Sequence, residues 1–331
     1  MKKKFIISFA ATFAVLLVAM LAYFNSTGGE YIAMVETEPL IAAIDIEPPF
    51  MPAEIARIEI FDDVIPIGEP EETYEEEPEP EEPPAQVFSL PTYQIDALLR
   101  LDDNNIALLY KNLETGFTHT FNADRVFFGA SLNKLNHALY VFELAERGLI
   151  NLNHVHTFTE GDIRSGTGTI QHMEIGTQFT TRELLRHSMI HSDNVAQHML
   201  IRHTSGASFT YADFVQQIGA NPNFIGNIRA QNTSVTDKLI WLEAIHNYIN
   251  SDGAFAHFFR ADLLATPGFI MSDYPMARKY GWATASFHDA AIVYTPSPYI
   301  LIILSDIEEG DATLFANISM RVQRLNREWF E

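Results

Sequence analysis

A long acidic, proline-rich stretch in the first quarter of the chain limits where a folded core can form. From Gly68 to Ala85 the sequence holds nine Glu and five Pro. Such a stretch cannot bury enough apolar surface to offset the entropy of ordering its backbone, and like charges together with proline favour extended conformations. We therefore predict a semi-stiff stalk over residues 25–87 and one globular domain over residues 88–331. A sensing or cation-binding tail is the alternative for the stalk, and the role of the more apolar residues 41–67 stays open.

The N-terminus has the pattern of a membrane anchor, which we place at residues 1–24. Lys2, Lys3 and Lys4 precede an uncharged run from Phe5 to Phe24, and about twenty helical residues at roughly 1.5 Å each cross a bilayer. Because positively charged flanks stay in the cytoplasm, we expect a single-pass protein of the cell membrane with its globular domain outside. A cleaved signal peptide is the alternative.

The charge argues against a nucleic acid partner, and the lack of cysteine excludes several kinds of covalent and metal chemistry. The formal net charge is −22 at pH 7, and the chain has no cysteine. A surface that binds nucleic acid needs clustered Lys and Arg, so we expect no nucleic acid partner. The lack of cysteine excludes disulfides, thiolate metal sites and lipidation at a thiol. We expect no cofactor.

Residue patterns after Phe88 predict strands at both ends of the domain and helices between them. Turn residues and apolar runs predict one hairpin from 106–110 and 117–121, and a second from 290–294 and 299–305. Apolar side chains at helical spacing predict a helix from Leu135 to a C-cap at Gly148, and others over 181–190, 195–202, 237–248 and 312–329. This order favours an α/β (α+β) fold, in which an antiparallel sheet is flanked by helices and an all-helical subdomain is inserted.

The first of three short motifs is an S-x-x-K formed by Ser131 and Lys134. Residues three apart share a face of a helix, so the Lys134 amine can reach the Ser131 hydroxyl. A lysine that is partly buried beside other cations loses its proton more readily and can then act as general base. Ser131 at a helix N-terminus would also direct backbone N–H groups at a developing oxyanion. Alone, however, the motif occurs by chance in many proteins.

Two further motifs follow in the chain. Ser192-Asp193-Asn194 interrupts two predicted helices, where a loop can present a hydroxyl and an amide to a ligand. Lys279-Tyr280-Gly281, followed by Trp282, lies just before the first predicted C-terminal strand, where a glycine lets a substrate approach the backbone. Taken singly, the first triplet is typical of a helix N-cap, and the second of an edge-strand lysine before a bulge.

Together, S-x-x-K, S-D-N and a K-T-G-like triplet in this order resemble the signature of class A β-lactamases and penicillin-binding proteins. The resemblance covers about Tyr93 to Glu331. It implies the two-part fold of that family, with the active site between the sheet and the helical subdomain. It also implies an enzyme, a serine hydrolase that forms an acyl-enzyme with β-lactams or with the D-alanyl peptides of peptidoglycan.

The resemblance also implies roles for single residues. Ser131 would attack the carbonyl carbon, Lys134 would take its proton, and Ser192 would relay a proton to the leaving nitrogen. Asn194 would bind the substrate amide and Lys279 its carboxylate. In the same family pattern, the backbone N–H groups of Ser131 and Trp282 would form the oxyanion hole, next to Gly281.

The chain departs from the family in two places. The stretch from Gly219 to Thr236, where class A enzymes carry the glutamate that activates the deacylating water, contains no Asp or Glu. Asn221, Asn223 or Asn232 could orient a water, but an amide is not a base. We therefore expect slow deacylation. Tyr280 replaces a small hydroxyl residue, which leaves carboxylate recognition open.

Four histidines raise the question of a metal site: His187, His191, His198 and His203. An H-x-x-x-H without an accompanying glutamate is a weak signal, so we interpret them as surface or packing residues and expect no metal. The alternative to an enzyme is a catalytically weak surface protein that binds wall peptide or a partner at the same site. The missing glutamate and Tyr280 favour that alternative.

Overall fold

The computed structural model describes residues 92–99, 101, 105–225, 232–307 and 312–331. The predicted membrane anchor (1–24), the predicted stalk (25–87) and the apolar residues 41–67 lie outside the described residues, so these remain predictions. Among the described helices, none is long and apolar enough to cross a membrane.

The centre of the domain is a five-stranded antiparallel sheet in the order β2-β1-β9-β8-β7. Its strands are β1 (Ile106–Asn112), β2 (Thr118–Phe121), β7 (Met276–Ala283), β8 (Ser286–Val293) and β9 (Tyr299–Ser305). The first two strands pair with the last three through β1 and β9, where Ile106 lies opposite Ser305 and Asn112 opposite Tyr299. Both ends of the domain therefore build one sheet, as the strand pattern predicts.

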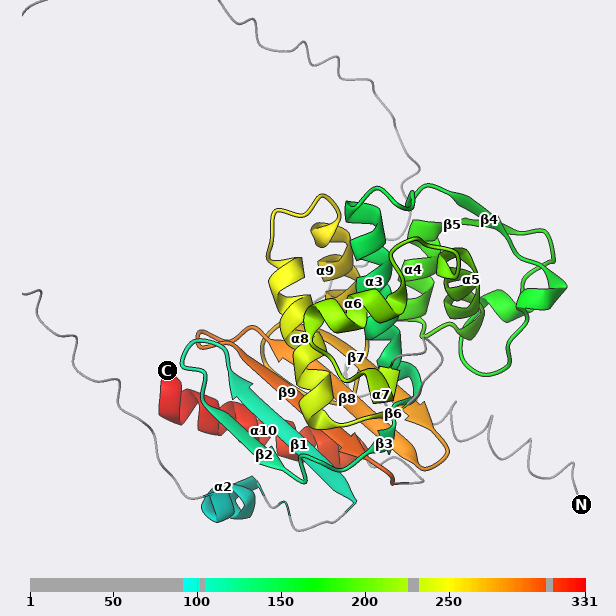
Figure 1. Ribbon diagram of the computed structural model, residues 1–331. Coiled ribbons are helices and arrows are strands. Elements are labelled where there is room, and N and C mark those ends of the chain that lie inside the picture. The colour runs from blue at the N-terminus through cyan, green and yellow to red at the C-terminus, as the bar shows by residue number, and fades with distance from the viewer. Residues whose placement is uncertain (1–91, 100, 102–104, 226–231, 308–311) are drawn as a thin grey trace, which may run out of the picture. The chain divides into compact units, whose positions relative to one another are not determined.

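The sheet is buried on both faces, because its strands alternate between two apolar clusters. Leu109 and Ile302 pack into one cluster with residues of helices on one face. Leu108 and Ile303 point the other way, into a cluster that includes Phe315 from the C-terminal helix. Figure 1 shows that helix, α10 (Ala312–Phe330), lying along its face of the sheet.

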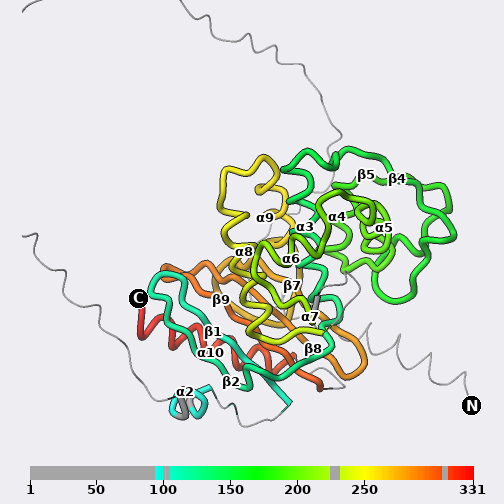
Figure 2. Tube along the Cα trace, in the orientation of Figure 1, coloured from blue at the N-terminus to red at the C-terminus, as the bar shows by residue number. Residues whose placement is uncertain are grey.

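The other helices come mostly between β2 and β7. In order, they are α2 (Thr92–Leu99), α3 (Lys134–Glu146), α4 (Thr181–Ile190), α5 (Asn194–Thr204), α6 (Tyr211–Ile218), α7 (Pro222–Ile225), α8 (Val235–Ile249) and α9 (Ala256–Ala265). Helix α2 packs beside α10, whereas α8 contacts β1, β8 and β9 from the opposite face. In Figure 2 the chain leaves the sheet after β2, forms this helical part and returns at β7.

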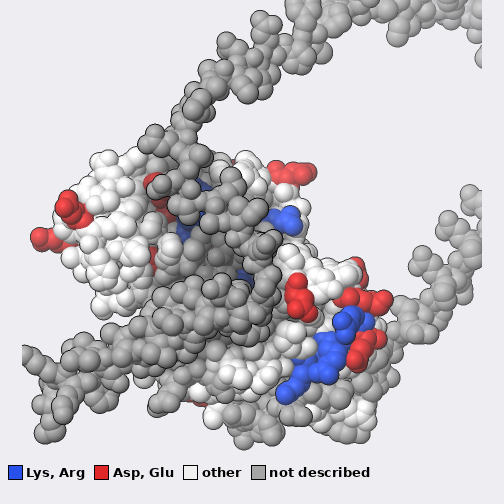
Figure 3. All heavy atoms as spheres, turned by 180° about the vertical axis from the view of Figure 1, so that it is seen from behind, with Lys and Arg blue, Asp and Glu red and all other residues white. Residues whose placement is uncertain are grey.

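Short elements complete the domain. Two small ladders pair β3 (Phe127–Phe128) with β6 (Asn232–Thr233), and β4 (Val155–Thr157) with β5 (Gln178–Thr180). Single 3-10 turns are η1 (Ala130–Asn133), η2 (Glu160–Asp162) and η3 (Ile170–His172). On the face seen in Figure 3, the largest group of Lys and Arg side chains has Asp and Glu side chains on both sides of it.

The predicted elements are found close to where the sequence patterns place them, and the fold class is confirmed. Gly148 follows the α3 helix with a left-handed φ of 68°, as a C-cap glycine should. The C-terminal strands differ from the prediction. Lys279-Tyr280-Gly281 does not precede the first of them but lies inside a third strand, β7, which is the edge of the sheet.

Candidate active site

Ser131 lies in the 3-10 turn η1, immediately before helix α3. The turn is held by the buried side chain of Leu132 and by its backbone N–H, which donates to the Gly129 carbonyl at 3.1 Å. Ala130, just before the serine, has a φ of 45°, which non-glycine residues rarely adopt. A non-glycine residue is held in such a conformation only where the surroundings impose it, and such positions often belong to functional sites.

The edge strand β7 packs directly against this turn, and Gly281 makes the close approach possible. A Cβ atom at Gly281 would lie 2.8 Å from the Leu132 backbone nitrogen and 2.9 Å from the Gly129 carbonyl oxygen. Backbone atoms cannot move aside as the end of a side chain can, so only glycine fits here. The strand continues through this position in regular pairing, with Gly281 opposite His288. The alternative of a bulge is therefore wrong.

Lys134 joins the serine turn to the S-D-N triplet. It is the first residue of α3, its side chain is buried, and its amine donates to Asn194 Oδ1 at 2.8 Å and to Ser192 Oγ at 3.3 Å. A further, short hydrogen bond runs from the amine to the Ser192 carbonyl oxygen. Among the hydrogen bonds of the described residues, none joins Lys134 to Ser131. Catalytic hydrogen bonds are often long before substrate binds, so Lys134 remains a candidate for the base.

Burial lowers the pKa of Lys134 to about 7, although the negative charge of Asp193 opposes the shift. An ammonium loses hydration in an apolar site, so the neutral amine becomes easier to form. A large fraction of the amine is then unprotonated near neutral pH. This is the state that a general base needs, and a value close to the working pH suits proton transfer.

Asp193 organises the backbone of the triplet. Its Oδ1 accepts from the N–H groups of Val195 and Ala196 at the start of α5, at 2.9 and 3.0 Å. Its Oδ2 accepts from the N–H groups of Thr169 and Ile170, at 2.7 and 2.9 Å. The N-cap interpretation of the triplet is thus correct for Asp193. It does not exclude the other interpretation, because Ser192 and Asn194 contact Lys134.

A glycine loop at 165–169 closes over the triplet, and the sequence patterns did not identify it. Gly166 and Gly168 have φ values of 115° and 113°, and a Cβ at either would collide with Asn194 or Asp193 respectively. Asn194 Nδ2 donates to the Ser165 carbonyl at 2.9 Å, which fixes the orientation of its amide. A pair of glycines two apart is a visible signal, but the loop's contacts are not local, so spacing alone could not place it.

Lys279 brings a second buried lysine side chain to the same region. Its side chain is fully buried, and its amine donates to the Tyr280 carbonyl at 3.1 Å and lies 4.2 Å from the centre of the Tyr280 ring. Burial lowers its pKa well below the usual value, the positive charge of Lys134 lowers it further, and Asp289 opposes both. Lys279 lies two residues before Gly281, which packs against the backbone of the serine turn at Leu132 and Gly129. The Tyr280 ring also packs edge-on against Phe269 at 5.3 Å.

A third buried lysine lies below the serine turn and was not predicted as part of the site. Lys238 in α8 donates to Asn133 Oδ1 at 3.0 Å and to Asn136 Oδ1 at 2.8 Å. Burial lowers its pKa to about 7, against the neighbouring charge of Asp237. Asn133 is the third residue of the S-x-x-K motif, so Lys238 supports the motif from the side of the helical core.

The structure describes two parts of the segment from Gly219 to Thr236, which contains no Asp or Glu. Asn221 directs its backbone N–H at Asp237 Oδ1, at 2.9 Å, and its own Oδ1 accepts from the backbone of Asn223 at 3.0 Å. Asn232 pairs with Phe128 through the β3–β6 ladder. Asp237 is buried, which raises the pKa of its carboxyl group. Residues 226–231 lie outside the described part of this segment.

The four histidines singled out by helical spacing do not come together. His187 and His191 lie near each other, with ring centres 5.4 Å apart. The His198 ring pairs with Arg164 at 2.8 Å. His203 belongs to a different group, with His154 and His156.

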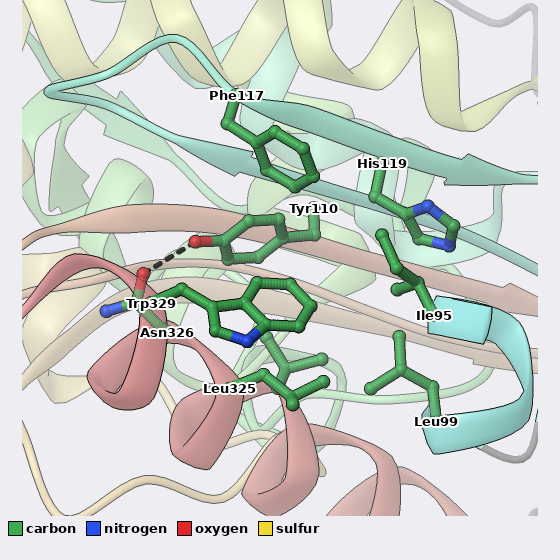
Figure 4. A pocket seen from close by; sticks show the side chains of 9 residues that line it. Ile95, Leu99, Tyr110, Phe117, His119, Leu325, Asn326 and Trp329 are labelled. Carbon is green, nitrogen blue, oxygen red and sulfur yellow. Dashed lines mark hydrogen bonds between the residues drawn. The ribbon is translucent and has the colours of Figure 1, made fainter. Parts of the chain in front are cut away.

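A pocket on the α10 face of the sheet is separate from these residues. It is lined by apolar and aromatic side chains of α2, β1, β2 and α10, among them Leu99, Phe117 and Trp329. Figure 4 shows Tyr110 within it, with the hydroxyl donating to Asn326 Oδ1 at 2.6 Å. No residue of the three motifs lines this pocket, so it is separate from the candidate site.

Comparison with known proteins identifies the family and the fold of the chain. A family model described as the beta-lactamase enzyme family matches residues 91–325. No curated protein matches the chain in sequence. The solved structures similar to it include a mutant of PBP-A in an acyl-enzyme complex with penicillin G, at 21% identity and a TM-score of 0.61, covering 72% of this chain and 96% of that one.

Two solved β-lactamases are similar to the same extent. The enzyme from Sphaerobacter thermophilus has 15% identity and a TM-score of 0.62, and the match covers 72% of this chain and 99% of that one. The enzyme from Chitinophaga pinensis has 20% identity and a TM-score of 0.61, with 71% and 98% covered. At these identities the likeness establishes the fold.

Proposed function

The chain belongs to the beta-lactamase enzyme family, and from this membership we propose that Ser131 is the nucleophile of a serine hydrolase that forms an acyl-enzyme with β-lactams or with D-alanyl wall peptides. The observation that carries the proposal is the position of Lys134. Its buried amine, with a pKa lowered to about 7, lies between the serine turn and the hydroxyl and amide of the S-D-N triplet.

The acylation step follows from these groups. The neutral amine of Lys134 takes the proton of Ser131 Oγ while that oxygen bonds to the carbonyl carbon, and the carbonyl π electrons move onto its oxygen. Backbone N–H groups of Ser131 and Trp282 stabilise the resulting oxyanion. When the carbon–nitrogen bond breaks, the proton passes from Lys134 through Ser192 Oγ to the leaving nitrogen. Lys134 thereby returns to its neutral form.

Asn194 and Lys279 bind the substrate in this proposal. The side-chain amide of Asn194 is fixed by Ser165 and Lys134, so it is oriented before a substrate amide arrives. Burial and Lys134 disfavour the charged form of Lys279 by lowering its pKa, and a substrate carboxylate beside the amine would favour that form again. A substrate carboxylate would be attracted there, because opposite charges interact strongly where water is scarce.

Deacylation is slow in this proposal. Hydrolysis of the ester needs a base to activate water, and the sequence supplies no Asp or Glu between Gly219 and Thr236. We also propose that residues 1–24 anchor the protein in the cell membrane with the enzyme domain outside, where wall peptides occur. The lysines before the uncharged run support this orientation.

Intact-mass spectrometry of the full chain with a penicillin tests the proposal. Opening of a β-lactam ring leaves its nitrogen attached to the acyl group, so Ser131 should gain the whole mass of the penicillin. Ser131→Ala should show no adduct, whereas Ser251→Ala, which changes an exposed serine far along the chain, should show the full adduct. An adduct that persists in Ser131→Ala would disprove the role of Ser131.

Binding without turnover is the second candidate function. Among the hydrogen bonds of the described residues, none joins Lys134 to Ser131, and this favours binding alone, because acylation needs a base that reaches the serine. In that case no adduct would form, and the protein would bind a D-alanyl peptide equally well with Ser131→Ala.

A further inference from the structure

His154, His156 and His203 form a compact group of imidazole rings away from Ser131. The ring centres of His154 and His156 are 4.7 Å apart, those of His154 and His203 are 4.9 Å apart, and those of His156 and His203 are 4.5 Å apart. One ring nitrogen from each residue lies within 4.8 Å of those of the other two. Three nitrogens on one tetrahedral zinc ion, at roughly 2.0–2.1 Å each, would be about 3.4 Å apart. A small contraction of the group would therefore reach coordination geometry.

The three rings come from two elements, strand β4 and helix α5, which meet at one point. His154 and His156 are two residues apart at strand β4, so they lie on the same side of it. His203 lies near the C-terminal end of α5. The N-terminal end of α4 is held beside them, because the Thr181 backbone N–H donates to the His154 carbonyl at 2.9 Å.

Thr181 also determines which nitrogen of His156 is free. The Thr181 hydroxyl lies 2.8 Å from His156 Nε2 and 3.4 Å from the His154 carbonyl oxygen. A hydroxyl has one proton, and when it donates that proton to the carbonyl it accepts a hydrogen bond from Nε2–H of His156. The other nitrogen, Nδ1, then keeps its lone pair. Ligand histidines in metal sites usually have such a second hydrogen bond, which sets the tautomer.

His203 supplies an unsatisfied nitrogen. Its Nε2 is buried and has no hydrogen-bond partner among the described residues. A buried polar atom without a partner costs free energy, and most such atoms in proteins are satisfied. A metal ion bound by this nitrogen would remove that cost.

The local charges do not oppose a cation strongly. Arg202 is adjacent to the group, but its guanidinium is paired with the buried carboxylate of Asp162, at 3.0 Å from Nε to Oδ1. Neutral imidazole is the form that binds metal ions.

We propose that His154, His156 and His203 bind a divalent transition-metal ion of the zinc type. Imidazole nitrogen suits zinc, copper and nickel, whereas magnesium and calcium prefer oxygen ligands. Since His154 is exposed, the fourth position is open to water. The ion ties β4 and the start of α4 to the end of α5.

The site is distinct from the serine site. The S-D-N triplet joins the C-terminal end of α4 to the N-terminal end of α5, whereas Thr181 and His203 lie at the opposite ends of these two helices. A ten-residue helix such as α4 is about 15 Å long at roughly 1.5 Å per residue. The metal therefore stabilises the helical part without taking part in acylation.

Zinc binding by the full chain, without a polyhistidine tag and after removal of metals with a chelator, tests the proposal. Titration with zinc chloride in competition with a chromophoric chelator should show one ion per chain. His154→Ala should weaken binding at least about tenfold, and Thr181→Val should weaken it by roughly 10–100-fold through loss of the tautomer-fixing hydrogen bond. His172→Ala, which changes an exposed histidine outside the group, should leave it unchanged. Equal affinity of the His154→Ala variant and the wild type would overturn the proposal.

Two measurements on the unmodified sequence do not depend on the folding of a variant. Zinc at a free concentration about 100-fold above its Kd should raise the Tm by roughly 5–10 °C, because it binds only the folded state. Bound Co²⁺ should show the intense visible absorption of a tetrahedral nitrogen site. No rise in Tm would show that the three histidines hold no ion, and the weak spectrum of octahedral Co²⁺ would overturn the tetrahedral geometry.

Discussion

The amine of Lys134 donates a hydrogen bond of 2.8 Å to Asn194 Oδ1, and this bond joins two motifs that are sixty residues apart in the chain. Through this bond each of the two residues positions the other. Asn194 holds the amine in a buried position, and Lys134 orients the amide, whose nitrogen is bound to Ser165. A base and a substrate-binding group that position each other should be sensitive to the same changes.

Acylation should therefore depend on pH through Lys134. Its pKa is lowered to about 7 by burial, and the neutral amine is the active form, so the rate of adduct formation should rise with pH and level off above about pH 8. The rate of adduct formation, followed by mass spectrometry between about pH 5.5 and 9, checks this. Lys134→Met should lower the rate by about 10²–10⁴-fold and abolish the profile. A wild-type rate independent of pH would exclude Lys134 as the base.

Gly281→Ala should separate β7 from the serine turn. The added Cβ would lie within 3 Å of two backbone atoms of the turn, at Leu132 and Gly129, and overpacking of this kind costs about 1–3 kcal/mol. We expect a comparable loss in the free energy of unfolding by denaturant, and acylation at least about tenfold slower because the serine is misplaced. Gly206→Ala is the matched control, since a Cβ there has no atom within 4 Å. Equal acylation rates in the two variants would contradict the role of the contact.

Asp193→Ala should weaken both the start of α5 and the loop at 165–169. The carboxylate accepts from four backbone N–H groups, and its removal leaves Thr169 and Ile170 without a partner. We expect a loss of at least about 2 kcal/mol in unfolding free energy. Thr210→Ala, at the exposed N-cap of α6, should cost less. A loss no larger than in that control would mean that the loop is held by other contacts.

The acyl-enzyme should be long-lived. After free penicillin is removed, the adduct on Ser131 should persist for many times the period needed to form it. The reason is that the segment from Gly219 to Thr236 has no Asp or Glu to activate water. Repeated mass spectra over time measure its decay. Rapid loss of the adduct with continuous hydrolysis of the antibiotic would show that another group, such as the buried Asp237, performs this step.

The sequence predicted the parts of this site that are local. Ser131 and Lys134 share one turn, and the hairpins follow from alternation, so their positions depend on residues a few places apart. The glycine loop at 165–169 was not predicted, because it contacts Asn194. Asn194 lies far along the chain, and residue spacing does not indicate such contacts. For the histidines, helical spacing did not show which rings lie together: His154 directly precedes β4 and His156 lies in it, and their H-x-H spacing places both on one side, beside His203.

Lys238 should make the stability of the domain depend on pH above neutrality. Its pKa is lowered from the usual 10.5 to about 7 by burial, so between these values the unfolded chain binds a proton that the folded chain does not. The free energy of unfolding must then rise with pH in this range, by up to about 1.4 kcal/mol per pH unit for each such lysine. Below pH 7 both states are protonated, and the destabilisation by the buried charge is complete.

Urea unfolding at several pH values between about 7 and 9 measures this slope, below the range where tyrosines titrate. Lys134 contributes in the same direction, so Lys238→Met should reduce the slope without removing it. Lys111→Met is the matched control, because that lysine is partly exposed and paired with Glu243, and it should leave the slope unchanged. If Lys238→Met has the wild-type slope, Lys238 must be charged in the folded protein, and its bonds to Asn133 and Asn136 would be those of a permanent ammonium.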